Sequence, residues 1–262
     1  MRAAREAAGA ARLESEVGAR MLERLDYVKI APRRILDAGS GPLRDARALA
    51  GRYGKADVIA LDFSAGMLRS GRARFAFLRK NPLRICADLS RLPLGAGSVD
   101  FVWSNMALHW VEDPLAAFKE AARVLAAEGL LMFSTLGPDT LKELRGAAGA
   151  TRVHEFIDMH DLGDMLVAAG FAAPVVDMEL LTFTYSDGAA LLADLRAGGQ
   201  TNARRDRPRG LAGRGLLAKI RASMQGAASF EVVYGHAWKG APRKLADGRD
   251  IVEFRPKARP LS

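Results

Sequence analysis

The sequence is poor in cysteine and in aromatic residues. It holds one cysteine, Cys86, among 262 residues, so an internal disulfide is excluded. Because Cys86 lies in an apolar run, we expect a buried thiol in a reducing compartment. Aromatic residues make up 7% of the chain and are not interleaved with its arginines, which argues against single-stranded nucleic acid as a ligand. We therefore expect no nucleic-acid partner.

Long apolar runs are also missing. No stretch reaches the roughly 18 uncharged apolar residues of a membrane-spanning helix, so we expect no membrane partner. The first residues lack the continuous apolar centre of a secretory signal, and they include Glu6, Glu14 and Glu16. We expect a cytoplasmic location and no metal site.

The chain is strongly basic, with a formal net charge of +9 at pH 7. Its lysines and arginines gather in residues 69–74 and 79–80, in 204–214 and in 239–257. Such patches attract polyanions, acidic proteins or a phosphorylated carrier arm. An ordinary solvated surface explains them equally well. Charge alone therefore leaves the partner open.

A glycine-rich turn follows the first apolar strand. Residues 34–38 lead through Asp37 into Gly39 and Gly41, where missing side chains let backbone N–H groups approach a ligand. The residues after Gly41 break the G-x-G-x-x-G fingerprint of dinucleotide sites. Asp37 would repel phosphates but suits the sulfonium and ammonium charges of S-adenosylmethionine. The turn predicts a site for this cofactor, although a plain strand-turn-helix has the same pattern.

Two more strand-like segments end in carboxylates. Asp62 closes the apolar run 58–61 about 20 residues after the turn, where ribose hydroxyls could donate to it. Asp88 closes the run 84–87, and a solvated strand end or a helix cap is the alternative explanation there. Acids at three successive strand ends are hard to obtain by chance. Because the carboxyl ends of parallel strands share one edge of a sheet, we expect the three acids at that edge.

The alternation of apolar segments predicts an α/β fold with parallel strands and helices on both faces of the sheet. The expected strands are 34–38, 58–61, 84–87, 101–104, 130–135, 174–184 and 230–238. The expected helices are 14–27, 44–53, 66–77, 114–125, 160–170, 189–198 and 216–224. The last strand should pair antiparallel with the one before it.

Several segments together resemble one enzyme family. The turn at 37–43 is similar to motif I of class I methyltransferases, whose usual form is acid-x-Gly-x-Gly-x-Gly. The stretches Ser-Asn-x-Ala-Leu-His-Trp at 104–110 and Leu-Arg-x-x-Gly-x-x-Asn at 195–202 are the discriminating part. On these residues the sequence resembles the malonyl-acyl-carrier-protein O-methyltransferases of biotin synthesis. Further matching segments extend the resemblance over nearly the whole chain: 60–64, 87–94, 133–141, 156–165 and 230–239.

The resemblance implies a Rossmann-like class I methyltransferase fold. It has a mostly parallel seven-stranded sheet and a substrate-capping insertion in the C-terminal third. We divide the chain into an N-terminal helical segment (1–30), a cofactor-binding core (31–150), a C-terminal part of the same domain with the cap (151–240) and a polar basic tail (241–262).

The resemblance also implies a reaction. The family moves the methyl group of S-adenosylmethionine to the free carboxylate of a malonyl thioester, which leaves a methyl ester and S-adenosylhomocysteine. The partner would be an acidic acyl carrier protein, and the arginines of 204–214 could steer its docking. The cofactor would be held by Asp37, Gly39, Gly41, Asp62, Phe63, Asp88, Leu89 and Ser104.

The chemistry of this reaction points to a second set of residues. A malonyl carboxylate is already ionised near neutral pH, so the transfer needs positioning and desolvation and no strong base. Arg196 is the candidate for orienting the carboxylate, because a guanidinium fork can hold one. A surface arginine of a helix is the alternative. His109 and Trp110 would line the transfer channel, unless this pair serves packing alone.

The sequence departs from the family pattern in places, and three rival functions stay open. Leu43 stands where motif I has its third glycine, and the N-terminal segment lacks the aromatic residues expected there. One rival is a methyltransferase for another small carboxylic acid, such as an aconitate-type enzyme. A second is an assembly factor that binds S-adenosylmethionine and hydroxylates a protein arginine. The third is a binding module without catalysis, which Leu43 makes conceivable.

Overall fold

The protein is an α/β fold, seen here in a computed structural model that describes residues 12–71, 81–208, 210, 213–223 and 227–240. The strands are Arg34–Ala38 (β1), Asp57–Asp62 (β2), Leu83–Cys86 (β3), Val99–Asn105 (β4), Leu125–Leu136 (β5), Phe171–Thr184 (β6) and Ala227–Lys239 (β7). The α-helices are Arg12–Arg24 (α2), Arg44–Arg52 (α3), Ala65–Ser70 (α4), Pro114–Val124 (α5), Lys142–Ala148 (α6), Met159–Ala168 (α7), Gly188–Ala197 (α8) and Arg214–Ser223 (α9). Short 3-10 helices cover Leu25–Tyr27 (η1), Leu108–Trp110 (η3) and Ala150–Arg152 (η4). Within these described ranges, no helix is long and apolar enough to cross a bilayer.

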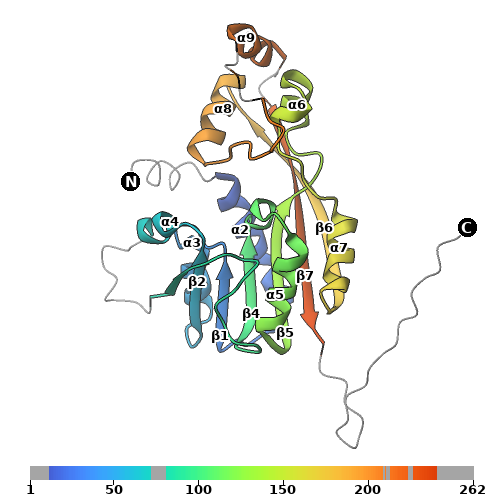
Figure 1. The fold of residues 1–262 in the computed structure, drawn as a ribbon. Helices are drawn as coiled ribbons and strands as arrows, with labels where there is room; N and C mark the ends of the chain where they lie inside the picture. The colour runs from blue at the N-terminus through green and yellow to red at the C-terminus, as the bar shows by residue number, and fades with distance from the viewer. Residues whose placement is uncertain (1–11, 72–80, 209, 211–212, 224–226, 241–262) are drawn as a thin grey trace, which may run out of the picture.

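The seven strands form one sheet in the order β3-β2-β1-β4-β5-β7-β6 (Figure 1). The first five strands of this order pair parallel with one another. β7 pairs antiparallel with both β5 and β6. This topology confirms the predicted seven-stranded, mostly parallel sheet and the antiparallel pairing of the last two strands.

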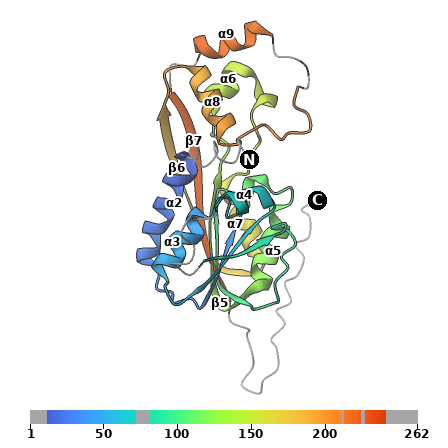
Figure 2. The ribbon, with the colours of Figure 1, turned by 90° about the vertical axis from the view of Figure 1, so that its left-hand side faces the viewer.

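Helices cover both faces of the sheet because its central strands are apolar on both sides. Ile35 and Leu36 are neighbours in β1 and are both fully buried, yet they belong to opposite halves of the core. The half around Ile35 includes residues of α2, α3 and α4, and the half around Leu36 includes residues of α5 and α7. Figure 2 shows α2 and α3 on one side of the sheet and α5 and α7 on the other.

β6 and β7 reach beyond the rest of the sheet and carry an additional layer. They pair from Phe171–Lys239 to Thr184–Ala227, whereas β5 follows β7 as far as Leu136–Val232. The extra length holds α6, α8 and α9 above the carboxyl ends of the parallel strands (Figures 1 and 2). We call these three helices, with the described residues of 149–158 and 198–208, the cap.

The predicted elements lie close to the observed ones, with specific exceptions. β5 begins at Leu125, directly after α5, and therefore earlier than predicted. The helix predicted over 66–77 is present as α4, and residues 72–80 lie outside the described part of the chain. The start of the N-terminal segment (1–11) and the tail (241–262) lie outside it too. Helix α6 was not predicted.

The prediction of a buried thiol at Cys86 is wrong. Cys86 is exposed, and its Sγ lies 3.3 Å from the carbonyl oxygen of Phe63. The physical reason is the place of Cys86 on β3, which forms one edge of the sheet and is therefore less covered than the central strands.

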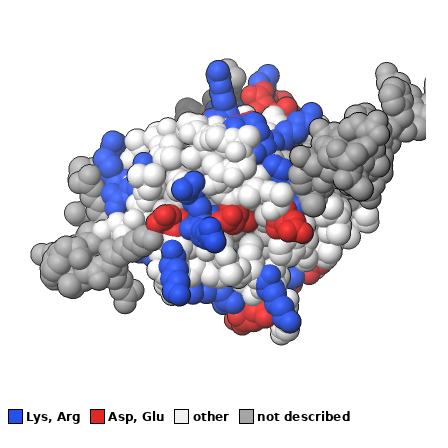
Figure 3. All heavy atoms as spheres, turned by 90° about the horizontal axis from the view of Figure 1, so that it is seen from below, with Lys and Arg blue, Asp and Glu red and all other residues white. Residues whose placement is uncertain are grey.

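The face opposite the cap mixes charges of both signs. Figure 3 views the molecule from below and shows lysine and arginine side chains on this face with aspartate and glutamate side chains among them. At the start of β1, the backbone N–H groups of Arg33 and Arg34 donate to Asp100 at 2.8 and 2.9 Å. A mixed surface of this kind is typical of a solvated face.

Candidate active site

The glycine turn after β1 needs a glycine for steric reasons. Gly39 adopts a φ of +84°, and a Cβ at this position would lie 2.2 Å from the Cβ of Ala107. The N–H groups of Gly39 and Ser40 both donate to the carbonyl of Leu61, at 2.8 and 2.9 Å. The turn is thereby tied to the end of β2 and presents backbone with little side-chain bulk. Such a surface allows a cofactor to approach the chain closely.

Leu43 takes the backbone conformation that a glycine adopts most easily. Its φ is +66° and its ψ +23°, at the residue before α3, and its side chain is fully buried. Gly71 leaves room for it, because a Cβ on Gly71 would lie 2.7 Å from the Cγ of Leu43 and 2.4 Å from the carbonyl oxygen of Pro42. The chain therefore makes a left-handed step here although it lacks the third glycine of motif I.

Asp62 joins the glycine turn to the end of β2. It is 8% exposed, and its Oδ2 accepts a hydrogen bond from the N–H of Gly41 at 2.9 Å. Its Oδ1 accepts from the N–H of Ser64 at 2.8 Å. Each carboxylate oxygen has a second lone pair, which can accept from a ligand hydroxyl. The neighbouring Phe63 is 77% exposed, so its ring is available to a ligand at this edge.

Asp37 is the most enclosed of the three predicted acids. It is 1% exposed, and its Oδ2 has no hydrogen-bond partner among the described residues. Burial, followed by the nearby charge of Asp45, raises the pKa of Asp37 well above its ordinary value. A buried carboxylate oxygen without a partner, beside an open glycine turn, fits a ligand that brings positive charge.

The other three predicted cofactor residues differ in exposure. Asp88 is exposed, and its Oδ1 accepts from the N–H and the hydroxyl of Ser90 at 2.8 and 2.7 Å, which lowers the pKa of Asp88. Leu89 lies close to the glycine turn, because its Cδ1 is 3.9 Å from the point where a Cβ added to Gly39 would lie. Ser104 is buried and donates to the carbonyl of Ala38 at 2.8 Å. Its hydroxyl thus ties β4 to β1 beneath the turn.

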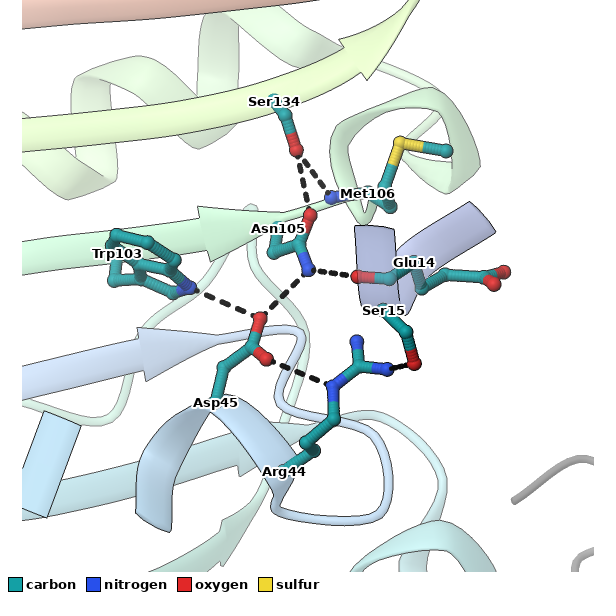
Figure 4. A network of polar contacts seen from close by, with 8 residues as sticks. All are labelled: Glu14, Ser15, Arg44, Asp45, Trp103, Asn105, Met106 and Ser134. Carbon is teal, nitrogen blue, oxygen red and sulfur yellow. Dashed lines mark hydrogen bonds and ion pairs between the residues drawn. The ribbon is translucent and has the colours of Figure 1, made fainter. Parts of the chain in front are cut away.

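A buried polar network holds the N-terminal helix α2 against this edge of the sheet. Asp45 at the start of α3 accepts from the indole N–H of Trp103 at 3.3 Å and from the amide of Asn105 at 2.7 Å (Figure 4). The same amide donates to the backbone carbonyl of Glu14 at 2.9 Å, and Ser134 donates to the amide oxygen at 2.8 Å. The network joins α2, α3, β4 and β5, and no motif in the sequence predicted it.

The three predicted catalytic residues line one cavity between the sheet and the cap. Its volume is about 230 Å³. Arg196 comes from the last turn of α8, and His109 and Trp110 come from η3 after β4. The other lining residues are Leu136, Thr140, Leu141, Leu144, Arg152, Val153, His154, Phe156, Leu192, Leu195, Gln200, Thr201, Asn202 and Phe230.

His109 is uncharged in the wall of this cavity near neutral pH. Burial and the nearby His154 lower its pKa to about 3, and the amide of Gln200 opposes this weakly. The ring of His109 lies 5.2 Å from that of Trp110 and 6.0 Å from that of Phe156, measured between centroids. Among the described residues, neither ring nitrogen makes a hydrogen bond of standard geometry. His109 therefore contributes neutral aromatic surface and no positive charge.

Residues 36–133 match the family model of the methyltransferase domain. The whole chain is 50% identical to the malonyl-[acyl-carrier protein] O-methyltransferase of Methylovorus sp. (strain MP688), over 95% of this chain and 90% of that protein. It is also 50% identical to the protein of the same name from Laribacter hongkongensis (strain HLHK9), over 95% and 91%. The chain belongs to the malonyl-[acyl-carrier protein] O-methyltransferase family.

Solved structures of other proteins share the fold of this chain. The YcgJ protein of Bacillus subtilis matches with a TM-score of 0.63 at 17% identity, over 86% of this chain and 99% of that chain. Phosphoethanolamine N-methyltransferase 2 of Haemonchus contortus, solved with S-adenosylhomocysteine, has a TM-score of 0.55 at 20% identity, over 85% and 52%. At these identities the likeness establishes the fold, and it confirms the predicted class I methyltransferase sheet.

Three residues of the cavity were not predicted from the sequence. Arg152, His154 and Phe156 lie between α6 and α7, and all three line the cavity. The rings of His154 and Phe156 lie 5.3 Å apart. A signal was present, because side chains of alternate residues in an extended segment point to the same side. The pattern His-x-Phe could have marked His154 and Phe156 as a pair, whereas Arg152 ends the 3-10 helix η4 before this segment.

The basic loop that begins at residue 204 was predicted to dock a carrier, and it lies beside the cavity. Some of its arginines form ion pairs with acidic side chains. Arg204 contacts Glu155 at 3.1 Å and Asp206 at 2.7 Å, and Arg205 pairs with Glu112. Glu112 and Glu155 also line a second cavity of about 240 Å³. His109 and His154 line both cavities. The predicted patch extends to residue 214, and much of it beyond residue 208 lies outside the described part of the chain.

Proposed function

We propose that this chain is a carboxyl O-methyltransferase that uses S-adenosylmethionine and acts on the malonyl group of malonyl-acyl carrier protein. The observation that carries the proposal is the 50% identity, over 95% of the chain, to a protein of that name. The cavity supports it independently, because it offers arginine side chains in otherwise uncharged walls. The product is the malonyl methyl ester, which the family resemblance places early in biotin synthesis.

The carboxyl edge of the sheet has residues that fit S-adenosylmethionine. When bound, this cofactor supplies an electrophilic methyl group on a positively charged sulfur. Asp37 would face the positive charge, and Asp62 would accept from the ribose hydroxyls. Asp88 and Leu89 would contact the adenine. Gly39 supports the fit, because its missing side chain opens the turn on which the cofactor would lie.

The cavity has residues that can position a carboxylate and exclude water. Arg196 would hold the carboxylate and leave one oxygen free to attack. Trp110 and Phe156 offer apolar surface, which strips water from the attacking oxygen. His109 stays neutral because its pKa is about 3. No residue has to remove a proton, since the acceptor is already ionised near neutral pH.

An acidic carrier protein fits the basic loop beside the cavity. The side chain of Arg205 is 89% exposed and that of its partner Glu112 is 83% exposed. Ion pairs this exposed contribute little to stability, so Arg205 can exchange Glu112 for a carboxylate of the carrier at small cost. Charge steering by this loop would raise the rate of encounter with the carrier. The proposal therefore assigns carrier docking to residues 204–208.

Mass spectrometry of malonyl-acyl carrier protein incubated with the protein and S-adenosylmethionine tests the proposal. We expect the malonyl group to gain the mass of one methylene, with one S-adenosylhomocysteine formed per ester. Asp62→Ala should abolish the gain because the ribose contact is lost, and circular dichroism checks that the variant is folded. Methylation of free small acids alone would assign the chain to another carboxyl methyltransferase. Addition of one oxygen to a protein arginine would assign it to the hydroxylase relatives.

The same assay at rising salt tests the docking surface. We expect the KM for malonyl-acyl carrier protein to rise with ionic strength, because salt screens the attraction between exposed charges. Arg205→Glu should raise the KM at low salt and have a smaller effect at high salt. A KM that depends neither on salt nor on Arg205 would contradict docking on this loop.

A further inference from the structure

A second arginine, Arg152, lines the same cavity as Arg196. Arg152 ends η4, and Arg196 lies in the last turn of α8, so two separate parts of the cap each contribute an arginine to one cavity. Among the described residues that line this cavity there is no aspartate or glutamate. The two arginines therefore give the cavity a positive charge that the walls do not balance.

Arg152 is half-buried and Arg196 is exposed, and neither guanidinium group makes an ion pair or a hydrogen bond within the part of the chain that the structure describes. Other arginines differ: Arg123 contacts Glu120 at 2.7 Å, and Arg204 contacts Asp206 at 2.7 Å. A partly buried cation without a counter-ion loses hydration that nothing replaces. Arg152 is such a cation, and together with the exposed Arg196 on the same cavity it indicates that the ligand carries negative charge.

We propose that Arg152 and Arg196 together clamp the ionised carboxylate of the acceptor and release the neutral ester that forms from it. The inference rests on the proposed function, which supplies the acceptor. A carboxylate has about four lone-pair sites on two oxygens, so it can accept from two guanidinium groups at once. One site remains for attack on the methyl group.

The clamp distinguishes substrate from product by charge. Methylation turns the carboxylate into an uncharged ester, which cannot keep the charge-assisted hydrogen bonds of the substrate. Negative charge also declines on the carboxylate as the new bond forms, so the clamp binds the ground state more strongly than the transition state. Loss of one arginine should therefore raise KM more than it lowers kcat. Arg152 is in this way a residue that determines specificity for an anionic acceptor.

Arg152→Gln tests the clamp in the complete protein. Steady-state methylation of malonyl-acyl carrier protein should show a KM raised by about tenfold or more, with kcat within about threefold of the wild-type value. The affinities for malonyl-acyl carrier protein and for its methyl ester are measured with S-adenosylhomocysteine bound. The wild type should prefer the carboxylate, and the variant should lose about tenfold of that preference.

Two further variants separate charge from structure. Arg152→Lys keeps a cation and should restore part of the preference for the carboxylate. Arg33→Gln removes an arginine before β1, at the end of the sheet away from the cap, and should leave both KM and the preference unchanged. The affinity for S-adenosylhomocysteine should be the same in all of these proteins, because the cofactor edge is untouched.

The results distinguish a failure of the clamp from a failure of the proposed function. If the wild type methylates malonyl-acyl carrier protein and Arg152→Gln keeps the full preference for the carboxylate, the clamp is refuted and the proposed function stands. A lower kcat with an unchanged preference gives Arg152 a structural role and refutes the clamp as well. If the wild type does not methylate malonyl-acyl carrier protein, the proposed function fails and the clamp fails with it.

Discussion

Asp37 is buried, where an ionised carboxylate is unfavourable. Its ionisation should therefore make cofactor binding depend on pH at the carboxyl edge of the parallel strands, which we call the cofactor edge. Burial and the charge of Asp45 raise the pKa of Asp37, so the fold favours its neutral form. The stability that this form contributes is fully present below the ordinary aspartate pKa of about 4 and is lost as the pH rises through the raised value. A bound positive charge has the opposite effect, because it favours the ionised form.

We expect binding of S-adenosylmethionine to release a proton from Asp37. The affinity should rise by up to about tenfold per pH unit until the pH passes the raised pKa, and should level off above it. Isothermal titration calorimetry in buffers of different ionisation enthalpy counts the proton. Asp37→Asn is the matched control, since it cannot ionise and should lose this part of the pH dependence. Equal pH dependence in the two proteins would refute the assignment.

Candidate residues for the site could be named from the sequence where a local pattern marks them. Asp37 and Asp62 end apolar runs, and the carboxyl ends of parallel strands share one edge. Arg196 was named as a candidate because a carboxylate acceptor calls for a cation to orient it. Arg152 was not found, because nothing local shows which surface an arginine of a short 3-10 helix will meet in the folded chain. The exposure of Cys86 also depends on the position of its strand in the sheet, which the local sequence does not contain.

The turn into α3 shows how an element keeps its shape with an unusual residue. A left-handed conformation costs a non-glycine residue about 1–2 kcal/mol. A fully buried leucine contributes about 2–5 kcal/mol relative to alanine. Burial of Leu43 therefore outweighs its backbone strain, and the turn needs no third glycine.

We expect both Leu43→Gly and Leu43→Ala to be less stable than the wild type in urea denaturation. Leu43→Gly should lower the free energy of unfolding by about 2 kcal/mol, because lost burial exceeds the strain relieved. Leu43→Ala loses the burial and keeps the strain, so it should be less stable than Leu43→Gly by about 1 kcal/mol. A glycine variant as stable as the wild type, or an alanine variant more stable than the glycine variant, would contradict this explanation.

Element positions were predictable, but the reach of the long strands was not. Residues 174–184 and 230–238 have strand composition, and their pairing was predicted correctly. The continuation of β6 and β7 past the end of β5 depends on tertiary contacts such as the edge-to-face pair of Phe183 and Phe230, whose rings lie 5.6 Å apart. α6 escaped prediction because it is 7 residues long, follows Leu141 in a left-handed conformation and contains Gly146.

In the whole molecule, the cofactor edge and the cavity lie in different layers that meet through short connections. Asn105 ends β4 at the cofactor edge, and His109 and Trp110 follow in η3 at the cavity. Glu14 of α2 also spans the two layers, because its carbonyl accepts from Asn105 at 2.9 Å and its carboxylate accepts from Gln200 of the cap at 2.6 Å. Ligands in the two places would therefore be neighbours.

A structure of the protein with S-adenosylhomocysteine and a malonyl thioester tests most directly whether the cofactor edge and the cap cavity form one methyl-transfer site. We predict the thioether sulfur near Asp37 and the malonyl carboxylate between Arg152 and Arg196. One carboxylate oxygen should point at the sulfur, with room for a methyl group between them. A malonyl group bound outside the cavity, or a carboxylate turned away from the sulfur, would contradict a single site.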